Sequence, residues 1–271
     1  MEKINNEVTV KVITEFIRNS VYKNGFKNGI LGVSGGLDSA VVLDLTVKAL
    51  GKDNTFALLM PYRLSSEESL KDGKLICEKL GVQYEVIDIS LPVDSYFKNF
   101  PTDNKTLLGN KCARERMSVL YDFSERKKAL VVGTSNKSEI LIGYSTLYGD
   151  SAAAFLPIGD LYKTEVFQLA EYLDIPGPIR NKKPSADLWK DQTDEGEIGF
   201  TYEKLDEILF NLIDRRMEKK DIEKLGFTLK DINKIEKMII NTQFKRTMPP
   251  ATKIHSRTVG IDFRYPRDWN K

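Results

Sequence analysis

One eight-residue segment constrains the fold of this chain more than any other part of it: Gly32-Val33-Ser34-Gly35-Gly36-Leu37-Asp38-Ser39. It follows an apolar run at 29–31 and precedes a run of helical periodicity that starts at Ala40. A strand therefore leads through a turn of small residues into the N-terminus of a helix. Such a turn presents unpaired backbone N–H groups and the positive end of a helix dipole to an anion. The segment predicts a phosphate-binding loop.

The side chains of this loop narrow the kind of phosphate site. Two adjacent glycines let the backbone approach a phosphate closely, the two serines add hydroxyl donors, and Asp38 adds a carboxylate suited to Mg²⁺. A lysine-containing phosphate loop needs Gly-Lys-Ser/Thr at its end, and the loop has no lysine. The dinucleotide fingerprint Gly-x-Gly-x-x-Gly is also absent. A plain Gly-Ser turn would not explain why strand, turn, acid and helix follow in this order.

Strands and helices alternate along the first half of the chain. We expect strands at 28–33, 55–60, 83–88 and 129–132, and helices at 3–23, 40–50, 66–80, 93–97 and 105–127. Alternation of this kind predicts an α/β fold, a Rossmann-like parallel sheet with helices on both faces. Proline and glycine punctuate the chain from about 176, and a charged helical pattern runs to about 242. We expect a single domain over 1–271, with a helical C-terminal part from about 200.

Composition excludes several classes of protein. Lysine and arginine total 41 against 39 acids, a net charge of +2, so no strong field indicates nucleic acid or a membrane surface. The two cysteines, Cys77 and Cys112, match no metal or redox spacing and are expected to be buried thiols. The chain has neither the apolar centre of a signal peptide nor a membrane-spanning stretch. These observations predict a cytoplasmic protein.

The loop resembles the pyrophosphate loop of the N-type ATP pyrophosphatases, which cleave ATP between the α- and β-phosphates. Further segments, taken in order with the loop, closely resemble the ammonia-dependent NAD synthetases. They lie at 109–117, 133–139, 143–150, 157–166 and 184–195. The resemblance covers about 5–250 and implies the adenine nucleotide alpha hydrolase-like fold. It implies that ATP and deamido-NAD⁺ form an adenylate with release of pyrophosphate, and that ammonia then displaces AMP to give NAD⁺.

The resemblance also assigns roles to single residues of this chain. It implies that ATP is bound by the residues 32–39 together with Thr134, Lys163 and Ser185. It implies Mg²⁺ as a cofactor, held by Asp38 and Glu139. Deamido-NAD⁺ would be contacted by Arg114 and Lys245, and the catalytic residues would be Asp38, Lys163 and Asp150. A homodimer is implied as well, with the first helix and the 105–127 helix as candidate contact faces.

Two of the substrate-contact positions depart from the pattern of the resemblance, and Phe244 stands where some relatives have a histidine. Leu147 stands where many relatives have a lysine that contacts the substrate, and Ala154 stands at the position of a later aspartate. Those two substrate contacts are therefore not assigned to this chain. The one histidine, His255, matches no motif and is not expected to act as a base.

Other functions remain compatible with the sequence. One alternative is another ATP-pyrophosphatase amidotransferase or a tRNA-modifying enzyme, although the balanced charge and the unpaired cysteines disfavour the latter. A non-catalytic adenine-nucleotide-binding module is a further alternative, but it would not need the acid pair or Lys163. The roughly 30 residues before the loop are too few for a glutamine amidase domain. Free ammonia, or ammonia from a separate protein, is therefore the expected nitrogen source.

Overall fold

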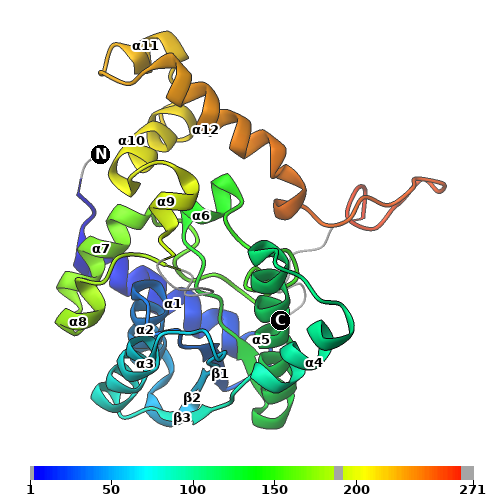
Figure 1. Ribbon diagram of the computed structural model, residues 1–271. Coiled ribbons are helices and arrows are strands. Elements are labelled where there is room, and N and C mark those ends of the chain that lie inside the picture. The colour runs from blue at the N-terminus through cyan, green and yellow to red at the C-terminus, as the bar shows by residue number, and fades with distance from the viewer. Residues whose placement is uncertain (1–2, 186–191, 264–271) are drawn as a thin grey trace.

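A parallel sheet forms the base of the molecule in the computed structural model, which describes residues 3–185 and 192–263 (Figure 1). Its strands are β1 (Asn28–Gly32), β2 (Thr55–Leu59), β3 (Gln83–Val86) and β4 (Ala129–Val131). In the described part of the chain they lie in the order β3-β2-β1-β4. All pairings are parallel, with Gly29 beside Thr55 and Asn28 beside Ala129. The predicted parallel sheet is confirmed, with each strand ending one or two residues earlier than expected.

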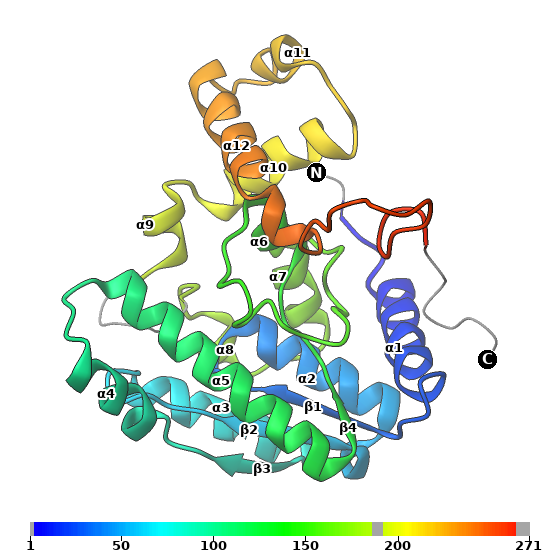
Figure 2. The same cartoon turned by 90° about the vertical axis from the view of Figure 1, so that its right-hand side faces the viewer.

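Helices cover both faces of the sheet, as predicted (Figure 2). One face carries α1 (Asn6–Tyr22), α2 (Leu37–Leu50), α3 (Glu67–Leu80), α7 (Lys163–Tyr172) and α8 (Gly177–Arg180), and the other carries α4 (Ser90–Asn99) and α5 (Lys105–Lys127). Because successive strand side chains point to opposite faces, Leu31 and Leu59 pack under the first set while Ile30 and Leu58 pack under the second. Cys77 on α3 and Cys112 on α5 are buried free thiols, as expected.

The N-terminus of α2 lies inside the predicted phosphate loop. The helix begins at Leu37, three residues before the predicted start, so Leu37, Asp38 and Ser39 form its first turn. Its N-cap is Gly36, which makes no side-chain capping bond. By contrast, Ser66 caps α3 by accepting from the Glu68 N–H. The N–H groups of the first turn of α2 therefore have no capping side chain between them and a ligand.

A second group of helices packs above α6 (Lys137–Ile142) and α7, away from the sheet (Figures 1 and 2). It comprises α9 (Asp194–Ile198), α10 (Tyr202–Ile213), α11 (Lys219–Glu223) and α12 (Leu229–Asn241). These helices share a separate hydrophobic cluster, in which Tyr202, Leu205 and Ile232 are buried. Short 3-10 turns, η1 (Lys52–Asn54) and η2 (Gln243–Arg246), follow α2 and α12. Within the described residues, no helix is both long and apolar enough to cross a membrane.

Candidate active site

A cavity of about 570 Å³ opens at the carboxyl ends of β1 and β4. The phosphate loop, α5 and the segment 143–150 line it, together with the residues 182–185 and Lys245. Ligands of open parallel sheets bind at this edge, where the strands end and the loops diverge. The structure therefore brings the predicted phosphate loop to the expected place.

The conformation of the loop depends on glycine at one position. Gly35 has a φ of +78°, and a Cβ atom there would lie 2.1 Å from the backbone oxygen of Ser69. No other residue type fits without moving the loop or α3. The hydroxyl oxygens of Ser34 and Ser39 lie 3.2 Å apart, and the Ser39 hydroxyl donates to the Gly36 carbonyl at 3.0 Å. Both hydroxyls are thereby held at the mouth of the loop.

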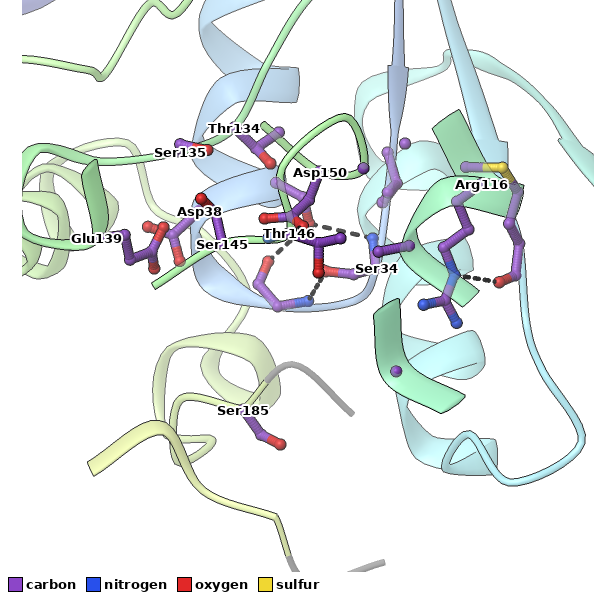
Figure 3. A pocket seen from close by; sticks show the side chains of 18 of the residues that line it. Ser34, Asp38, Arg116, Thr134, Ser135, Glu139, Ser145, Thr146, Asp150 and Ser185 are labelled. Carbon is purple, nitrogen blue, oxygen red and sulfur yellow. Dashed lines mark hydrogen bonds between the residues drawn. The ribbon is translucent and has the colours of Figure 1, made fainter. Parts of the chain in front are cut away.

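Two predicted acids and the predicted lysine meet beside the loop. The Lys163 ammonium donates a hydrogen bond to the Asp38 carboxylate and lies 3.7 Å from the Glu139 carboxylate. The Lys163 side chain is 2% exposed, and the Asp38 and Glu139 side chains are 17% and 16% exposed. Figure 3 shows the two carboxylates pointing toward each other. Lys163, Asp38 and Glu139 therefore form a cluster that is largely removed from water. In it one ammonium group lies close to two carboxyl groups.

The electrostatics of this cluster favour an additional cation. Burial and the neighbouring Asp38 charge raise the pKa of Glu139 well above its usual range. Burial lowers the pKa of Lys163, but the charges of Asp38 and Glu139 outweigh this effect and raise that pKa overall. The lysine is therefore charged and offsets Asp38, whereas Glu139 binds a proton more readily than an ordinary carboxyl group, a proton that a metal cation can replace. A hard cation with oxygen ligands fits such a donor pair.

Asn136 completes this cluster, although sequence motifs did not identify it as functional. Its side-chain amide donates to the Asp38 carboxylate at 2.9 Å, and it is fully buried. Its side-chain oxygen caps α6 by accepting from the Glu139 N–H at 3.0 Å, and the Glu139 carboxylate accepts from the Asn136 N–H. One residue thus orients both acids. The sequence signal for it is the capping-box pattern, Asn136 followed three residues later by Glu139.

Asp150 faces a different part of the same cavity. It is exposed to the cavity yet surrounded by protein, and this desolvation raises the pKa of its carboxyl above the usual value. Its carboxylate accepts a hydrogen bond from the Thr146 N–H at 2.8 Å. The Thr146 hydroxyl in turn donates to the Asn110 side chain at 2.7 Å, which ties the segment to α5. A carboxylate with a raised pKa in a cleft is a candidate proton acceptor.

The remaining predicted residues divide between the cavity and its surroundings. Thr134, Ser185 and Lys245 line the cavity. The Lys245 ammonium donates to the backbone oxygens of Gly143 and Ser145, at 2.7 and 2.6 Å, and burial lowers its pKa. Arg114 is exposed and does not line the cavity; its Nε donates to the Leu147 carbonyl oxygen at 3.3 Å. The predicted motif residues 186–191 lie outside the described residues.

Further polar residues of the cavity wall lie in the predicted motif segments, but the sequence assigned them no role in the site. Asp194 accepts hydrogen bonds from the hydroxyls of Tyr144 and Tyr202, at 3.1 and 3.2 Å. Burial raises the pKa of Asp194, and the Lys163 charge opposes this rise. On the side of the view away from Asp38 and Glu139, Arg116 Nε donates to the Met60 carbonyl at 2.9 Å (Figure 3). No local sequence pattern predicts the contacts of Tyr144 and Arg116, because each joins segments that are 50 or more positions apart.

Comparisons with known proteins agree on one family. The model of the NAD synthase family matches residues 9–249. The chain is 47% identical to the NH(3)-dependent NAD(+) synthetase of Trichlorobacter lovleyi over 268 residues, covering 99% of this chain and 98% of that protein. It is also 47% identical to the enzyme of the same name from Chlorobaculum tepidum over 260 residues, covering 96% and 94%.

Solved structures give the same result for the fold. The NH3-dependent NAD synthetase of Campylobacter jejuni superposes with a TM-score of 0.79 at 36% identity, covering 92% of this chain and all of that one. An NMN synthetase from Francisella tularensis superposes with a TM-score of 0.83 at 29% identity, covering 93% of this chain and all of that one. The predicted fold class is therefore confirmed.

Proposed function

The chain belongs to the NAD synthase family and is an NAD⁺ synthetase, a ligase that forms a carbon–nitrogen bond, and we propose how its own residues carry out that reaction. The overall reaction amidates deamido-NAD⁺ with ammonia and converts ATP to AMP and pyrophosphate. A free carboxylate is a poor electrophile, so it is first joined to AMP, which is a good leaving group. The residues of the cavity have to stabilise the phosphate charge in the first step and to manage a proton in the second.

The first proposed role is the binding of ATP by the phosphate loop. The N–H groups at the start of α2 and the hydroxyls of Ser34 and Ser39 would hold the two phosphates that leave as pyrophosphate. Lys163 would stabilise the negative charge that develops as the bond to the α-phosphate breaks. The single observation that carries this assignment is the buried ion pair of Lys163 with Asp38, which fixes a cation next to the loop.

We propose that Asp38 and Glu139 hold Mg²⁺. Their carboxyl groups are desolvated and flank one ammonium group, and the raised pKa of Glu139 indicates that this single ammonium does not offset both carboxylate charges. No group of three or more histidine, cysteine or acidic side chains suited to a metal occurs in the described residues. Two carboxylates are sufficient, because Mg²⁺ commonly takes its other ligands from substrate phosphates and water. Bound there, the ion would offset charge on the phosphates of ATP.

We propose that Asp150 serves the second step. Attack by ammonia on the adenylate leaves a proton on nitrogen, and ammonium must lose a proton before it can attack. The Asp150 carboxylate faces the cavity with a raised pKa, which suits it to accept such a proton. The Thr146 N–H fixes its orientation.

Arg114 and Lys245 remain proposals as contacts of deamido-NAD⁺. Lys245 lines the cavity next to the segment 143–145, so a substrate group there could replace a backbone acceptor of its ammonium group. Arg114 lies outside the cavity, beside Leu147, and would contact a part of the substrate that extends beyond it. That geometry suits a dinucleotide longer than the cavity.

We also propose that the chain acts as a homodimer in the cytoplasm. Val8, Val12 and Phe16 recur at every fourth position of α1, and each is at least 45% exposed. Three apolar side chains on one helix face favour burial against another surface. Sedimentation velocity at micromolar concentration should give twice the monomer mass, and a Val12→Glu variant should shift it toward the monomer.

The experiment that tests the function supplies ATP, Mg²⁺, ammonium and deamido-NAD⁺ to the purified protein. NAD⁺, AMP and pyrophosphate should form in equal amounts. A parallel assay with nicotinic acid mononucleotide tests the shorter acceptor, since one structural neighbour is an NMN synthetase. Formation of ADP and phosphate, or turnover of the mononucleotide alone, would contradict the proposal.

A further inference from the structure

Asp206 is a buried carboxylate outside the cavity and has none of the proposed roles in binding or proton transfer. It lies on α10, inside the hydrophobic cluster of the C-terminal helices, and is 1% exposed. Both of its oxygens accept hydrogen bonds, one from the Ser138 hydroxyl and the other from the Thr164 N–H at 2.8 Å. Figures 1 and 2 show α10 next to α6 and α7, the helices that carry these two donors.

The two donors occupy the first turns of their helices. Thr164 is the second residue of α7, and Ser138 is the second residue of α6. The Ser138 hydroxyl also accepts a hydrogen bond from the Lys163 N–H, at 2.9 Å. The first N–H groups of a helix have no partner inside the helix. Asp206 therefore serves the N-terminus of α7 directly through Thr164 and indirectly through Ser138.

These first turns carry the charged groups of the site. Lys163 is the first residue of α7, and Glu139 follows Ser138 on α6. Two successive hydrogen bonds, from the Ser138 hydroxyl to Asp206 and from the Lys163 N–H to the Ser138 hydroxyl, join the two turns. The distance of 3.7 Å between the Lys163 ammonium and the Glu139 carboxylate depends on how these turns are placed relative to each other.

We propose that Asp206 is a positioning residue for the reaction, which joins the N-termini of α6 and α7 and so sets the placement of Lys163 relative to Glu139. The inference rests on the proposed roles of those two residues. It assigns a function in the active site to the C-terminal helices, since the α10 carboxylate accepts hydrogen bonds from Ser138 on α6 and Thr164 on α7. The surrounding side chains Leu205 and Leu209 are fully buried and hold that part of α10 in place.

The test compares an Asp206→Asn variant with the wild-type enzyme. Asparagine keeps one acceptor for the Thr164 N–H but leaves the Ser138 hydroxyl without its acceptor. We expect kcat to fall on the order of 10- to 100-fold, because small errors in the placement of catalytic groups have effects of this size. The KM for ATP should change less than kcat, by about threefold, because the hydrogen bonds of Asp206 go to Ser138 and Thr164 and not to the phosphate loop.

Asn211→Ala serves as the matched control. Asn211 is a fully buried polar residue on the same helix, and its side-chain amide donates to the Glu207 carbonyl within α10. Its loss should lower the melting temperature without lowering kcat of the folded enzyme. If Asp206→Asn behaves in the same way, with wild-type kcat, Asp206 has only a structural role and the inference is wrong.

A second readout does not depend on turnover. An amine-reactive reagent followed by peptide mass spectrometry measures the accessibility of Lys163, which is 2% exposed in the native protein. Labelling of Lys163 should rise several-fold in Asp206→Asn and stay at the wild-type level in Asn211→Ala. Equal labelling in all three proteins would overturn the inference. Failure of the proposed function is distinguishable, because the wild-type enzyme would then form no AMP and pyrophosphate.

A Ser138→Ala variant keeps the experiment decisive if Asp206→Asn does not fold. It removes one hydroxyl, and with it the acceptor of the Lys163 N–H, while Asp206 still accepts from Thr164. We expect the same direction of change in kcat and in Lys163 labelling, with a smaller size. Wild-type kcat and labelling in a folded Ser138→Ala protein would contradict the proposal.

Discussion

The ammonium group of Lys163 donates a hydrogen bond to the carboxylate of Asp38, two residues that lie 125 positions apart in the sequence. This contact joins the first turn of α7 to the first turn of α2. The first turn of α2 is part of the phosphate loop, so the pair fixes the charged groups of the site to the loop and to α7. Changes to the charge cluster should consequently alter both the stability of the protein and its chemistry.

Replacing Lys163 by methionine should affect both stability and activity. The change removes the cation of a buried pair and leaves Asp38 facing Glu139, which should cost about 3 kcal/mol of unfolding free energy. Loss of the charge near the phosphates should reduce adenylate formation by on the order of 10²- to 10³-fold. Thermal unfolding and a pyrophosphate-release assay measure the two effects.

The same variant tests the proposed Mg²⁺ site without any turnover. With the ammonium group gone, the two carboxylates should bind Mg²⁺ more readily than they do in the wild-type protein without ATP. Addition of Mg²⁺ should therefore raise the melting temperature of Lys163→Met more than that of the wild type. An equal or absent response in both proteins would argue against Asp38 and Glu139 as ligands.

Two substitutions should separate the two roles of Asn136, which caps α6 and donates a hydrogen bond to Asp38. Asn136→Ala removes the cap of α6 and the hydrogen bond to Asp38, so it should lose about 1–2 kcal/mol of stability and much of the activity. Asn136→Asp keeps a good capping side chain but places a like charge next to Asp38. We expect the second variant to lose as much activity as the first at pH 8. If Asn136→Asp has wild-type kcat, the contact with Asp38 is not important for the reaction.

A pair of glycine substitutions isolates the requirement of the phosphate loop. Gly35 and Gly25 have nearly the same φ, +78° and +81°, but a Cβ at Gly25 meets no atom within 4 Å. Gly25→Ala should therefore show only the conformational cost, about 1 kcal/mol. Gly35→Ala adds a clash with the Ser69 oxygen and should weaken ATP binding at least tenfold. Calorimetric titration with ATP measures the difference, and equal affinities in the two variants would refute this account of the loop.

The sequence predicts the parts of this site that lie within one continuous motif. The loop 32–39 and the carboxyl end of β1 are local features, set by strand, turn and helix signals that neighbouring residues supply together. The resemblance to a family named Lys163, Glu139, Thr134 and Asp150 as site residues; all four line the cavity, and their roles remain predictions.

The rest of the site depends on packing between distant segments. The contacts of Asp206 with Ser138 and Thr164 span 68 and 42 positions, and Asn136 reaches Asp38 across 98. No periodicity or spacing encodes such pairs, because they form only after α6, α7 and α10 have packed. The start of α2 at Leu37 differs from the prediction for another reason. A glycine, Gly36, is its N-cap and offers no side-chain signal, and the first N–H groups of the helix are left for a ligand.

The pH dependence of the second step provides the sharpest test of Asp150. A base acts only when ionised, and the pKa of Asp150 is raised in the folded protein by desolvation. Activity should therefore fall as the pH decreases through the raised pKa of Asp150. Well below that pKa the carboxyl is protonated, and its contribution to the rate should be lost completely. Because the fraction of neutral ammonia also rises with pH, the assay must hold the concentration of free ammonia constant at every pH. Asp150→Asn keeps an acceptor for the Thr146 N–H but cannot take up a proton, so its kcat should be on the order of 10²- to 10⁴-fold lower. At saturating ATP and Mg²⁺, which oppose protonation of Glu139, the residual rate of this variant should lack the part of the acidic limb that Asp150 contributes. An unchanged limb in Asp150→Asn would assign that titration to another group and leave Asp150 with a binding role only.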